Sequence, residues 1–258
     1  MAKVEDGIFN FRGTIGGMTF RILNGKMVVS RKSSMSGDRL KNDKTYELLR
    51  RHDEQKRGVS KAIRPVYDAQ KICVRRGCKM LSGAFFRNLT MTKKKMKEGM
   101  DVGMETVKAK TAAEATRGTS LSLRKMDETV DFRYLKATKS GYGFSIRIGG
   151  EGVRLKDLLK HKAQDAEWVE LRFCCQTTTD VWYDKEMKVW DMDKSRLKRD
   201  VKWIRIGCED MNETIDTTIE TRIEMEERDD TDCALAMSVC YGRGEDEYIG
   251  EYSVCGQV

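Results

Sequence analysis

The chain has 258 residues, of which 39% are hydrophobic and 35% are charged, and its formal net charge is +8. That length suits one large domain or two small ones, each able to bury a core. No stretch approaches the roughly 18–20 consecutive apolar residues of a membrane-spanning helix, and residues 1–7 lack the apolar segment of a signal peptide. We therefore expect a cytoplasmic protein with no membrane partner.

The charge is divided unevenly along the chain. Residues 1–125 carry 29 Lys/Arg against 12 Asp/Glu, a net of +17, whereas residues 126–258 carry 20 against 29, a net of −9. A basic half predicts contact with nucleic acid or with another acidic surface. Opposite charges on the two halves also favour head-to-tail association of copies.

The N-terminal residues predict a β-hairpin preceded by an extended arm. Apolar and polar residues alternate from Met18, Asn24-Gly25 follows, and a second strand-like run covers residues 26–31. Asn-Gly between two such runs is a strong hairpin indicator, because both central turn residues need a positive φ. In the arm, residues 9–17, glycines allow a tight bend. Its apolar residues are the ones we expect to contact a partner: Phe9, Phe11 and Ile15.

A helical pattern begins near Asn42 and Asp43, either of which can cap a helix. Beyond Gly58, one stripe recurs at helical spacing: Val59, Ala62, Ile63, Val66, Ala69, Gln70 and Cys73. Pro65 lies inside the stripe, so we expect a helix start or kink there, with a break near Arg64. Helical character is expected to continue, interrupted at Gly77 and Gly83, toward Ala115.

After residue 118 the period changes to two, which predicts short strands. They are expected within residues 130–134, 142–148, 169–175, 181–183, 187–190, 202–208, 215–223, 233–241 and 248–254. One short helix is expected at residues 155–162, and a hairpin turn at residues 149–152. Strands at this spacing predict an antiparallel β-sandwich of immunoglobulin-like size. The predicted fold class is thus α+β, with a basic hairpin-plus-helical region at residues 1–118 and a β-rich acidic domain at residues 119–258.

The stretch from Phe11-Arg12-Gly13-Thr14-Ile15-Gly16-Gly17 through Asn24-Gly25-Lys26 to Val28-Val29-Ser30-Arg31-Lys32 resembles a family of uncharacterised Bacteroidota proteins. Arg64-Pro65 is similar to a proline position in that family, and the likeness covers roughly residues 5–70. The chain lacks the family's second proline and its glutamine-rich stretch. The resemblance implies a glycine-punctuated arm, a hairpin, an arginine-rich helical segment and a β-rich C-terminal part. It implies no activity and no catalytic residue.

The sequence contains no recognisable catalytic, cofactor or metal constellation. Its two histidines, His52 and His161, have no base partner or nucleophile motif around them. Cys73 and Cys78 are five residues apart, and nothing pairs with them at the ligand spacing of a zinc site. We therefore expect no enzyme activity, no cofactor, no metal and no small-molecule substrate. The eight cysteines are predicted to be reduced thiols that pack as small apolar groups.

Basic residues in the helical region leave three alternatives open. Arg50, Arg51, Lys56 and Arg57 could form a solvated helix face, contact nucleic acid phosphates, or contact the acidic half of a neighbouring copy. The sequence favours a non-enzymatic structural or interaction subunit that associates with itself or with another protein subunit. The resemblance and the arm indicate a phage or other mobile-element assembly, which would place the protein in the cytoplasm or in a virion. The alternative function is non-specific nucleic-acid binding through the basic N-terminal half.

Overall fold

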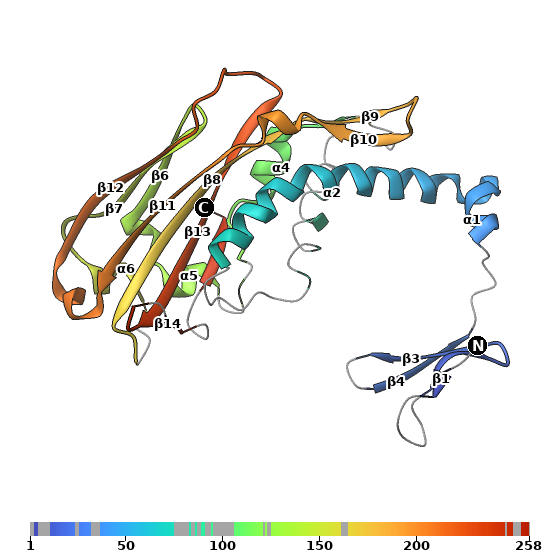
Figure 1. Cartoon of the computed structure of the whole chain (residues 1–258), viewed down its shortest axis with the longest axis horizontal. Coiled ribbons are helices and arrows are strands. Elements are labelled where there is room, and N and C mark those ends of the chain that lie inside the picture. The colour runs from blue at the N-terminus through green and yellow to red at the C-terminus, as the bar shows by residue number, and fades with distance from the viewer. Residues whose placement is uncertain are drawn as a thin grey trace. The chain divides into compact units, whose positions relative to one another are not determined.

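The computed structural model describes residues 3–4, 11–23, 26–31, 37–74, 83, 86, 89–90, 94, 106–120, 122, 125–160, 165–245, 247–249 and 254–257. The chain divides into two compact units, Met1–His52 and Asp53–Val258. Both contain antiparallel β-structure, and the chain is a mixed α+β protein (Figure 1), as the sequence predicts. The compact units divide near residue 52, whereas the sequence placed a boundary at residue 118.

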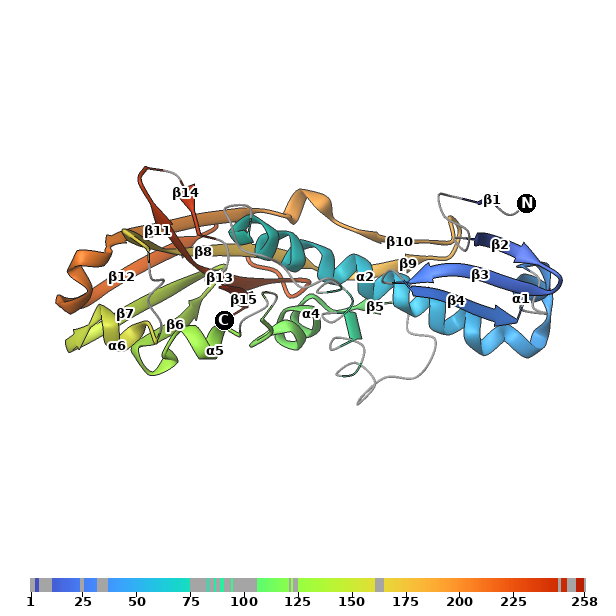
Figure 2. The same ribbon diagram turned by 90° about the horizontal axis from the view of Figure 1, so that it is seen from below.

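The N-terminal unit is built on a small antiparallel sheet with the strand order β1-β2-β3-β4. Its strands are β1 (Lys3–Val4), β2 (Phe11–Ile15), β3 (Met18–Leu23) and β4 (Lys26–Arg31). The predicted hairpin is confirmed, because β3 pairs with β4 in a register that places Leu23 opposite Lys26. Residues 11–15 of the expected extended arm are instead a paired strand, as Figure 2 shows. Gly16 and Gly17 turn the chain between β2 and β3 with φ values of 57° and 80°, which glycine adopts without a Cβ penalty.

Three helical elements follow the sheet: α1 (Gly37–Asn42), the 3-10 turn η1 (Lys44–Tyr46) and α2 (Glu47–Val74). Asp43 caps η1 as expected, because its carboxylate accepts a hydrogen bond of 3.0 Å from the Thr45 backbone N–H. This cap satisfies a donor that the first helical turn leaves without a partner.

Helix α2 continues through Pro65, so the expected break near Arg64 is wrong. A proline in a helix interior removes one backbone hydrogen bond and costs about 3 kcal/mol. Here the helix has compensating contacts, because the predicted apolar stripe is buried: Val59, Ala62, Ile63, Val66 and Ala69 are each at most 1% exposed. Burial of a large aliphatic side chain contributes about 1.5–3 kcal/mol, so packing of the stripe outweighs the effect of the proline.

The second compact unit, Asp53–Val258, which we call the β-rich unit, contains two larger antiparallel sheets. One has the order β11-β8-β13-β14, with β15 also paired to β13, and the other has the order β12-β7-β6. The first sheet comprises β8 (Trp168–Thr179), β11 (Arg199–Gly207), β13 (Thr231–Arg243), β14 (Glu247–Tyr248) and β15 (Val254–Gln257). The second comprises β6 (Leu135–Ser140), β7 (Gly143–Arg154) and β12 (Thr214–Arg222).

One hydrophobic core lies between these two sheets. Alternate residues of β7, such as Ile146 and Ile148, and alternate residues of β8, such as Leu171 and Phe173, belong to the same cluster of buried side chains. The opposite face of β13 packs against helices, because Ala234 clusters with Val66 of α2 and with Ala113 of α4 (Ala109–Thr116). All twelve residues of β8 are therefore buried.

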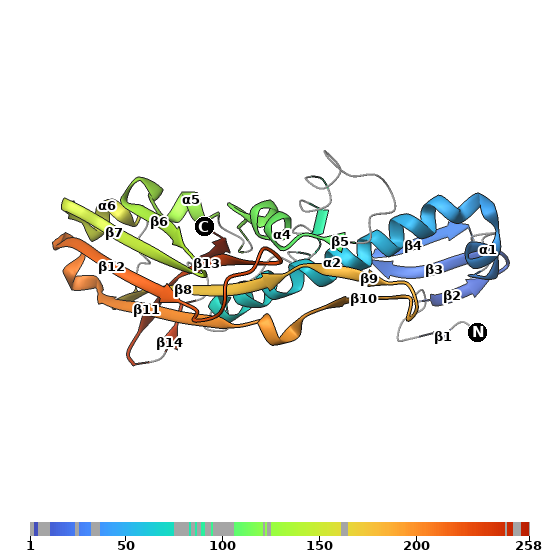
Figure 3. The ribbon, with the colours of Figure 1, turned by 90° about the horizontal axis from the view of Figure 1, so that it is seen from above.

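A third sheet, β10-β9-β5, packs on α2 beside these layers, as Figures 1 and 3 show. Its strands are β5 (Thr106–Val107), β9 (Val181–Asp184) and β10 (Val189–Met192). Figure 3 shows β8 continuing directly into β9. Gly58 lies in contact with Trp190, and a Cβ at this glycine would be only 2.7 Å from the indole ring. The absence of a side chain at residue 58 is what allows the tryptophan to pack so closely on the helix.

Several local predictions need correction. Residues 130–134 are not a strand: α5 (Met126–Thr129) precedes them, and η2 (Phe132–Tyr134) is capped by the Asp131 carboxylate. Residues 149–152 lie within β7, opposite a register shift in β12, and do not form a hairpin turn. Thr106–Val107 is a strand where helix was expected, because it pairs with β9. The remaining short elements are α6 (Leu155–Leu158), η3 (Lys194–Arg196) and η4 (Cys208–Asn212).

Among the helices of the described residues, none has the length and apolarity needed to cross a membrane.

Candidate functional site

The N-terminal sheet has one apolar face that is largely exposed. Side chains of directly paired residues point to the same face of a sheet, and successive residues alternate between faces. The registers of β2, β3 and β4 therefore place six apolar side chains on one face, with Arg31 opposite Met18 at its end. We call this set the apolar face: Ile15, Met18, Phe20, Ile22, Met27 and Val29. Four of its members are well exposed: Ile15 by 52%, Met18 by 51%, Met27 by 38% and Val29 by 48%.

The opposite face of the same strands is mainly polar. It carries Thr14, Thr19, Arg21 and Ser30 together with Val28, and the hydroxyls of Thr14 and Thr19 lie 3.1 Å apart in a cross-strand hydrogen bond. A sheet with one apolar and one polar face is normally covered on the apolar side, because short isolated strands are only marginally stable in water. The exposed face of this sheet is thus its apolar face, which is the face that another element or protein would normally cover.

Of the three arm residues that we expected to contact a partner, the structure describes the side chain of one, Ile15. Ile15 belongs to the apolar face and is half exposed. Phe11 is the first residue of β2, but its side chain lies outside the described residues, as does all of Phe9.

Two of the predicted basic residues have partners within the N-terminal unit. The Arg50 guanidinium donates hydrogen bonds of 2.8 Å to the backbone carbonyls of Leu40 and Asp43, which ties α1 and η1 to the start of α2. Arg51 forms an exposed ion pair of 2.7 Å with Glu47, one helical turn earlier. Arg50 therefore has a structural role, and Arg51 fits a solvated helix face.

The other two basic residues do not complete a single basic stripe. Arg57 pairs with Glu54 at 2.9 Å, and Lys56 is exposed. At about 100° per residue, Arg50 and Arg57 fall within about 20° of each other around the helix, whereas Arg51 and Lys56 lie roughly 100–120° to either side. The four side chains are dispersed around α2, and surface pairs of this kind contribute at most about 1 kcal/mol.

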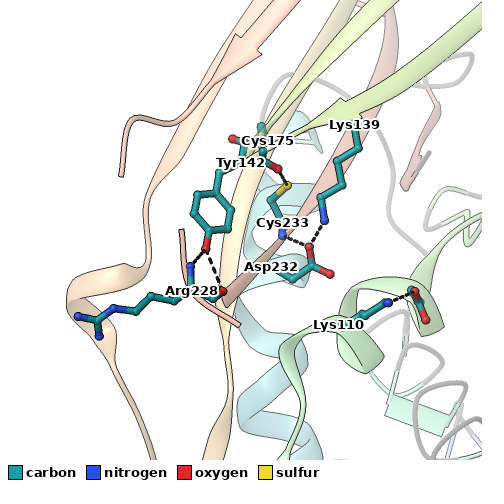
Figure 4. Close-up of polar contacts among 9 residues, drawn as sticks. Lys110, Lys139, Tyr142, Cys175, Arg228, Asp232 and Cys233 are labelled. Atoms are coloured by element: carbon teal, nitrogen blue, oxygen red, sulfur yellow. Dashed lines mark hydrogen bonds and ion pairs between the residues drawn. The ribbon is translucent and has the colours of Figure 1, made fainter. Parts of the chain in front are cut away.

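A second group of polar side chains, which sequence reasoning missed, lies in the β-rich unit (Figure 4). Asp232 and Cys233 are adjacent at the start of β13. The Asp232 carboxylate accepts a hydrogen bond from the ammonium of Lys139 on β6 and another, of 2.8 Å, from the Cys233 backbone N–H. These groups border a cavity of about 210 Å³, whose other wall includes Lys110, Glu114 and Arg117 of the α4 segment.

Tyr142 fixes the neighbouring turn. Its hydroxyl accepts a hydrogen bond of 2.7 Å from the Arg228 backbone N–H and donates to the Arg228 carbonyl at 3.1 Å. Tyr142 also lines two open hollows. One, of about 590 Å³, follows the start of β7 and the end of β12. The other, of about 500 Å³, lies between Lys139 and Arg228. The first is lined by apolar as well as polar side chains, among them the buried Phe144 and Ile223, and the second is lined mainly by polar residues.

Two thiols lie side by side next to this cavity. Cys175 of β8 and Cys233 of β13 are near-neighbours in the strand register, which pairs Cys233 with Thr177 and Cys175 with Leu235. The Cys175 thiol donates a hydrogen bond of 3.6 Å to the Tyr142 carbonyl, and the Cys233 thiol donates one of 3.7 Å to the Gly141 carbonyl. The interaction with the neighbouring Cys175 thiol and the charge of Lys139 lower the pKa of Cys233, although burial opposes the shift. The same contact and burial raise the pKa of Cys175.

The structure describes the side chains of one of the two histidines and of five of the eight cysteines. His52 is half-buried within α2, and His161 lies outside the described residues. No group of three or more His, Cys, Asp or Glu side chains that could hold a metal ion occurs among the residues described. Five of the eight cysteines are buried and form no disulfide: Cys174, Cys175, Cys208, Cys233 and Cys240.

No protein-family model, curated protein sequence or solved structure matches this chain. Functional inference therefore depends on the surfaces and the polar groups described above.

Proposed function

We propose that this chain is a non-enzymatic structural or interaction subunit that associates with copies of itself through the apolar face of its N-terminal sheet. The observation that carries the proposal is the 38–52% exposure of four apolar side chains on that face. A contiguous exposed apolar surface bordered by polar residues is typical of protein–protein interfaces. We further propose that the two packed sheets of the β-rich unit form an immunoglobulin-like sandwich, and that the setting is a phage or other mobile-element assembly.

Charge complementarity supports a second copy as the partner. Residues 1–52 carry 11 Lys/Arg against 5 Asp/Glu, a net of +6. In the β-rich unit, residues 213–230 carry 8 Asp/Glu against 2 Arg, a net of −6, and most of these charged side chains are exposed. Head-to-tail association would bring the basic unit of one copy to this acidic stretch of the next, with the apolar face excluding water between them.

The test is the molar mass of the full chain, measured by size-exclusion chromatography with light scattering. The double substitution Met18→Glu with Val29→Glu places two charges on the apolar face, and we expect it to convert an oligomer into a monomer. The matched control is Thr19→Glu with Ser30→Glu, which adds the same charge to the same strands on the opposite face. The control should remain oligomeric. A wild-type chain that is monomeric at all concentrations would refute the proposal.

Two further measurements separate this function from nucleic-acid binding. Raising the salt concentration should weaken the oligomer, because surface charges are screened beyond about 8–10 Å. Deletion of residues 1–17 should abolish association while the β-rich unit stays folded. If the chain instead binds nucleic acid, log affinity should fall with log salt by roughly 0.9 per phosphate contact. Alanine at Arg50, Arg51, Lys56 and Arg57 together should then flatten that slope.

A further inference from the structure

The β9–β10 hairpin of the β-rich unit carries an exposed group of apolar side chains. Trp182 of β9 is 41% exposed, Val189 of β10 is 50% exposed, and Met187, in the turn that joins the two strands, is 71% exposed. We call these three side chains the hairpin patch. Figure 1 shows the hairpin projecting beyond the two larger sheets. Tryptophan and methionine are enriched at protein interfaces, so the hairpin patch is the kind of surface that a partner covers.

The other face of the same hairpin is already covered. Trp182 and Asp184 are two residues apart on β9, and Val189 pairs with Asp184, so Trp182 and Val189 lie on one face. The residues that alternate with them are buried against α2: Val181, Trp190 and Met192. The hairpin is therefore held in place by its inner face, and the hairpin patch is left on its outer face.

Hydrogen bonds fix the turn that carries Met187. The Asp184 carboxylate accepts hydrogen bonds of 2.9 Å from the backbone N–H groups of Glu186 and Met187. Lys188 completes the turn with a φ of 53°, a conformation that residues other than glycine seldom adopt. Because the backbone of the turn is ordered in advance, little conformational freedom is lost when a partner covers the hairpin patch.

The hairpin patch differs from the other exposed apolar residues of the β-rich unit by its clustering. In the described part of that unit, the remaining large apolar side chains that are well exposed lie far apart in the sequence: Phe86, Phe132 and Trp203. A single exposed apolar residue is ordinary on a protein surface, whereas a group of them on one element indicates a binding surface.

Charge indicates what kind of partner the hairpin patch fits. The Asp180 backbone N–H, immediately before β9, donates a hydrogen bond of 2.7 Å to the Asp230 carbonyl. The acidic stretch 213–230, with its net charge of −6, thus ends at the base of the hairpin. A matching partner presents apolar side chains flanked by positive charge. The N-terminal unit has this composition, since it has a net charge of +6 and the exposed Arg31 lies at the end of its apolar face.

We propose that the hairpin patch receives the apolar face of a second copy, so that copies associate head to tail. This inference rests on the proposed self-association and identifies the second of the two surfaces that meet. Because the two surfaces differ, each bound pair keeps one of each unfilled, and association continues into an open filament or closes into a ring. An interface between two apolar faces would instead stop at a dimer.

The first experiment changes the hairpin patch in the full chain and measures the molar mass by size-exclusion chromatography with light scattering. Trp182→Lys with Val189→Lys, the hairpin variant, should be monomeric at concentrations where the wild type is oligomeric. The matched control is Phe132→Lys with Trp203→Lys, which adds the same charge at two exposed aromatic residues of the same unit. The control should keep the molar mass of the wild type.

Circular dichroism checks that both variants are folded. If the hairpin variant is not, Trp182→Ala replaces it and Trp203→Ala becomes its control. Trp182→Ala should raise the dissociation constant by at least about tenfold, because a tryptophan at the centre of an interface often carries a large share of the binding free energy. Trp203→Ala should leave that constant unchanged.

The second experiment mixes two variants that cannot associate alone. The face variant, Met18→Glu with Val29→Glu, retains the hairpin patch, and the hairpin variant retains the apolar face. An equimolar mixture should form a dimer of one copy of each and grow no further, because the two surfaces left over are both blocked. Light scattering should report twice the mass of the monomer.

The outcomes separate this inference from the proposed function. A folded hairpin variant that oligomerises like the wild type, beside a monomeric face variant, would overturn the inference and leave the proposed function standing. A mixture of the two variants that stays monomeric would also overturn the inference. A monomeric wild type, or a face variant that still oligomerises, would refute both.

Discussion

The N-terminal sheet and the sheet centred on β8 contain similar strands and differ in what covers them. Strand β8 is covered by β7 on one face and by helices on the other, so that even Glu170 and Arg172 are buried. In the N-terminal sheet, Met18 and Val29 are about half exposed although they belong to an apolar face. The difference teaches that the elements packed on a strand, and not its own composition, decide whether its side chains are buried.

The largest effect is expected at Glu170. Its carboxylate accepts hydrogen bonds from Arg172 at 2.6 Å and from Arg205 at 3.2 Å, and the Arg205 guanidinium also lies 4.1 Å from the Trp168 ring centroid. Glu170→Ala leaves the buried Arg172 without its carboxylate partner, which typically costs about 3–5 kcal/mol. Urea unfolding followed by tryptophan fluorescence measures this loss, because all four tryptophans belong to the β-rich unit.

Glu151→Ala is the control for Glu170→Ala, since Glu151 is an exposed glutamate on β7. Its effect should lie within about 0.5 kcal/mol. Equal effects of the two substitutions would mean that the charge network around Glu170 does not support the sheet.

A valine pair compares the two sheets directly. Val169 of β8 is 0% exposed and Val29 of β4 is 48% exposed. Val169→Thr introduces a hydroxyl into the core and should cost about 1–3 kcal/mol, whereas Val29→Thr should cost less than about 0.5 kcal/mol. Tryptophan fluorescence reports the first substitution, and hydrogen exchange of the β3 and β4 amides reports the second.

The Val29→Thr measurement also bears on self-association. It should be made below the concentration at which copies associate and then repeated above that concentration. A cost that appears only in the oligomer would place Val29 in the interface, and a large cost in the monomer would contradict the exposure of the apolar face.

Gly58→Ala should produce a smaller loss, of about 1–2 kcal/mol. Helix propensity alone predicts a gain of about 1 kcal/mol on replacing a glycine within a helix. The new Cβ would lie 2.7 Å from the Trp190 ring, however, and crowding in a packed core typically costs about 1–3 kcal/mol. A red shift of tryptophan emission with lowered stability would agree with displacement of Trp190, and increased stability would show that the contact is not tight.

The smallest of the expected effects is the change in melting temperature at different pH values when Asp131 is replaced. The hydrogen bonds and charge of Arg133 lower the pKa of Asp131 from 3.8 to about 2. A carboxyl with a lowered folded-state pKa stabilises the fold above its unfolded pKa, and this contribution is lost as the pH falls from about 4 to about 2. Asp131→Asn should therefore melt at a lower temperature than the wild type at pH 6, and the two melting temperatures should converge near pH 2.

Local patterns in the sequence predicted much of the fold. The Asn-Gly turn predicted the β3–β4 hairpin, and the helical spacing from Val59 to Ala69 predicted the buried face of α2. The period of two in the sequence after residue 118 predicted β8 and β13. Of the candidate contact residues, Ile15 was found on the exposed apolar face, whereas the basic residues turned out to be dispersed around α2.

Other features were beyond reach of local patterns because they depend on contacts between distant residues. The cavity beside Asp232 and Cys233 requires α4 to lie over β13. Residues 130–134 alternate between apolar and polar as a strand does, yet residues 132–134 form a 3-10 helix that the Asp131 carboxylate caps.

The sequence by itself determined the periodicities, the turns and the charge division of this protein, because each depends on the chemistry of neighbouring residues. Only the tertiary structure decided that α2 passes through Pro65, that β8 is covered on both faces, and that the N-terminal apolar face is left exposed. The physical reason is that burial free energy depends on which surfaces meet. The free-energy cost of Pro65 within α2 is outweighed because the side chains that the helix buries stabilise the fold by a larger amount.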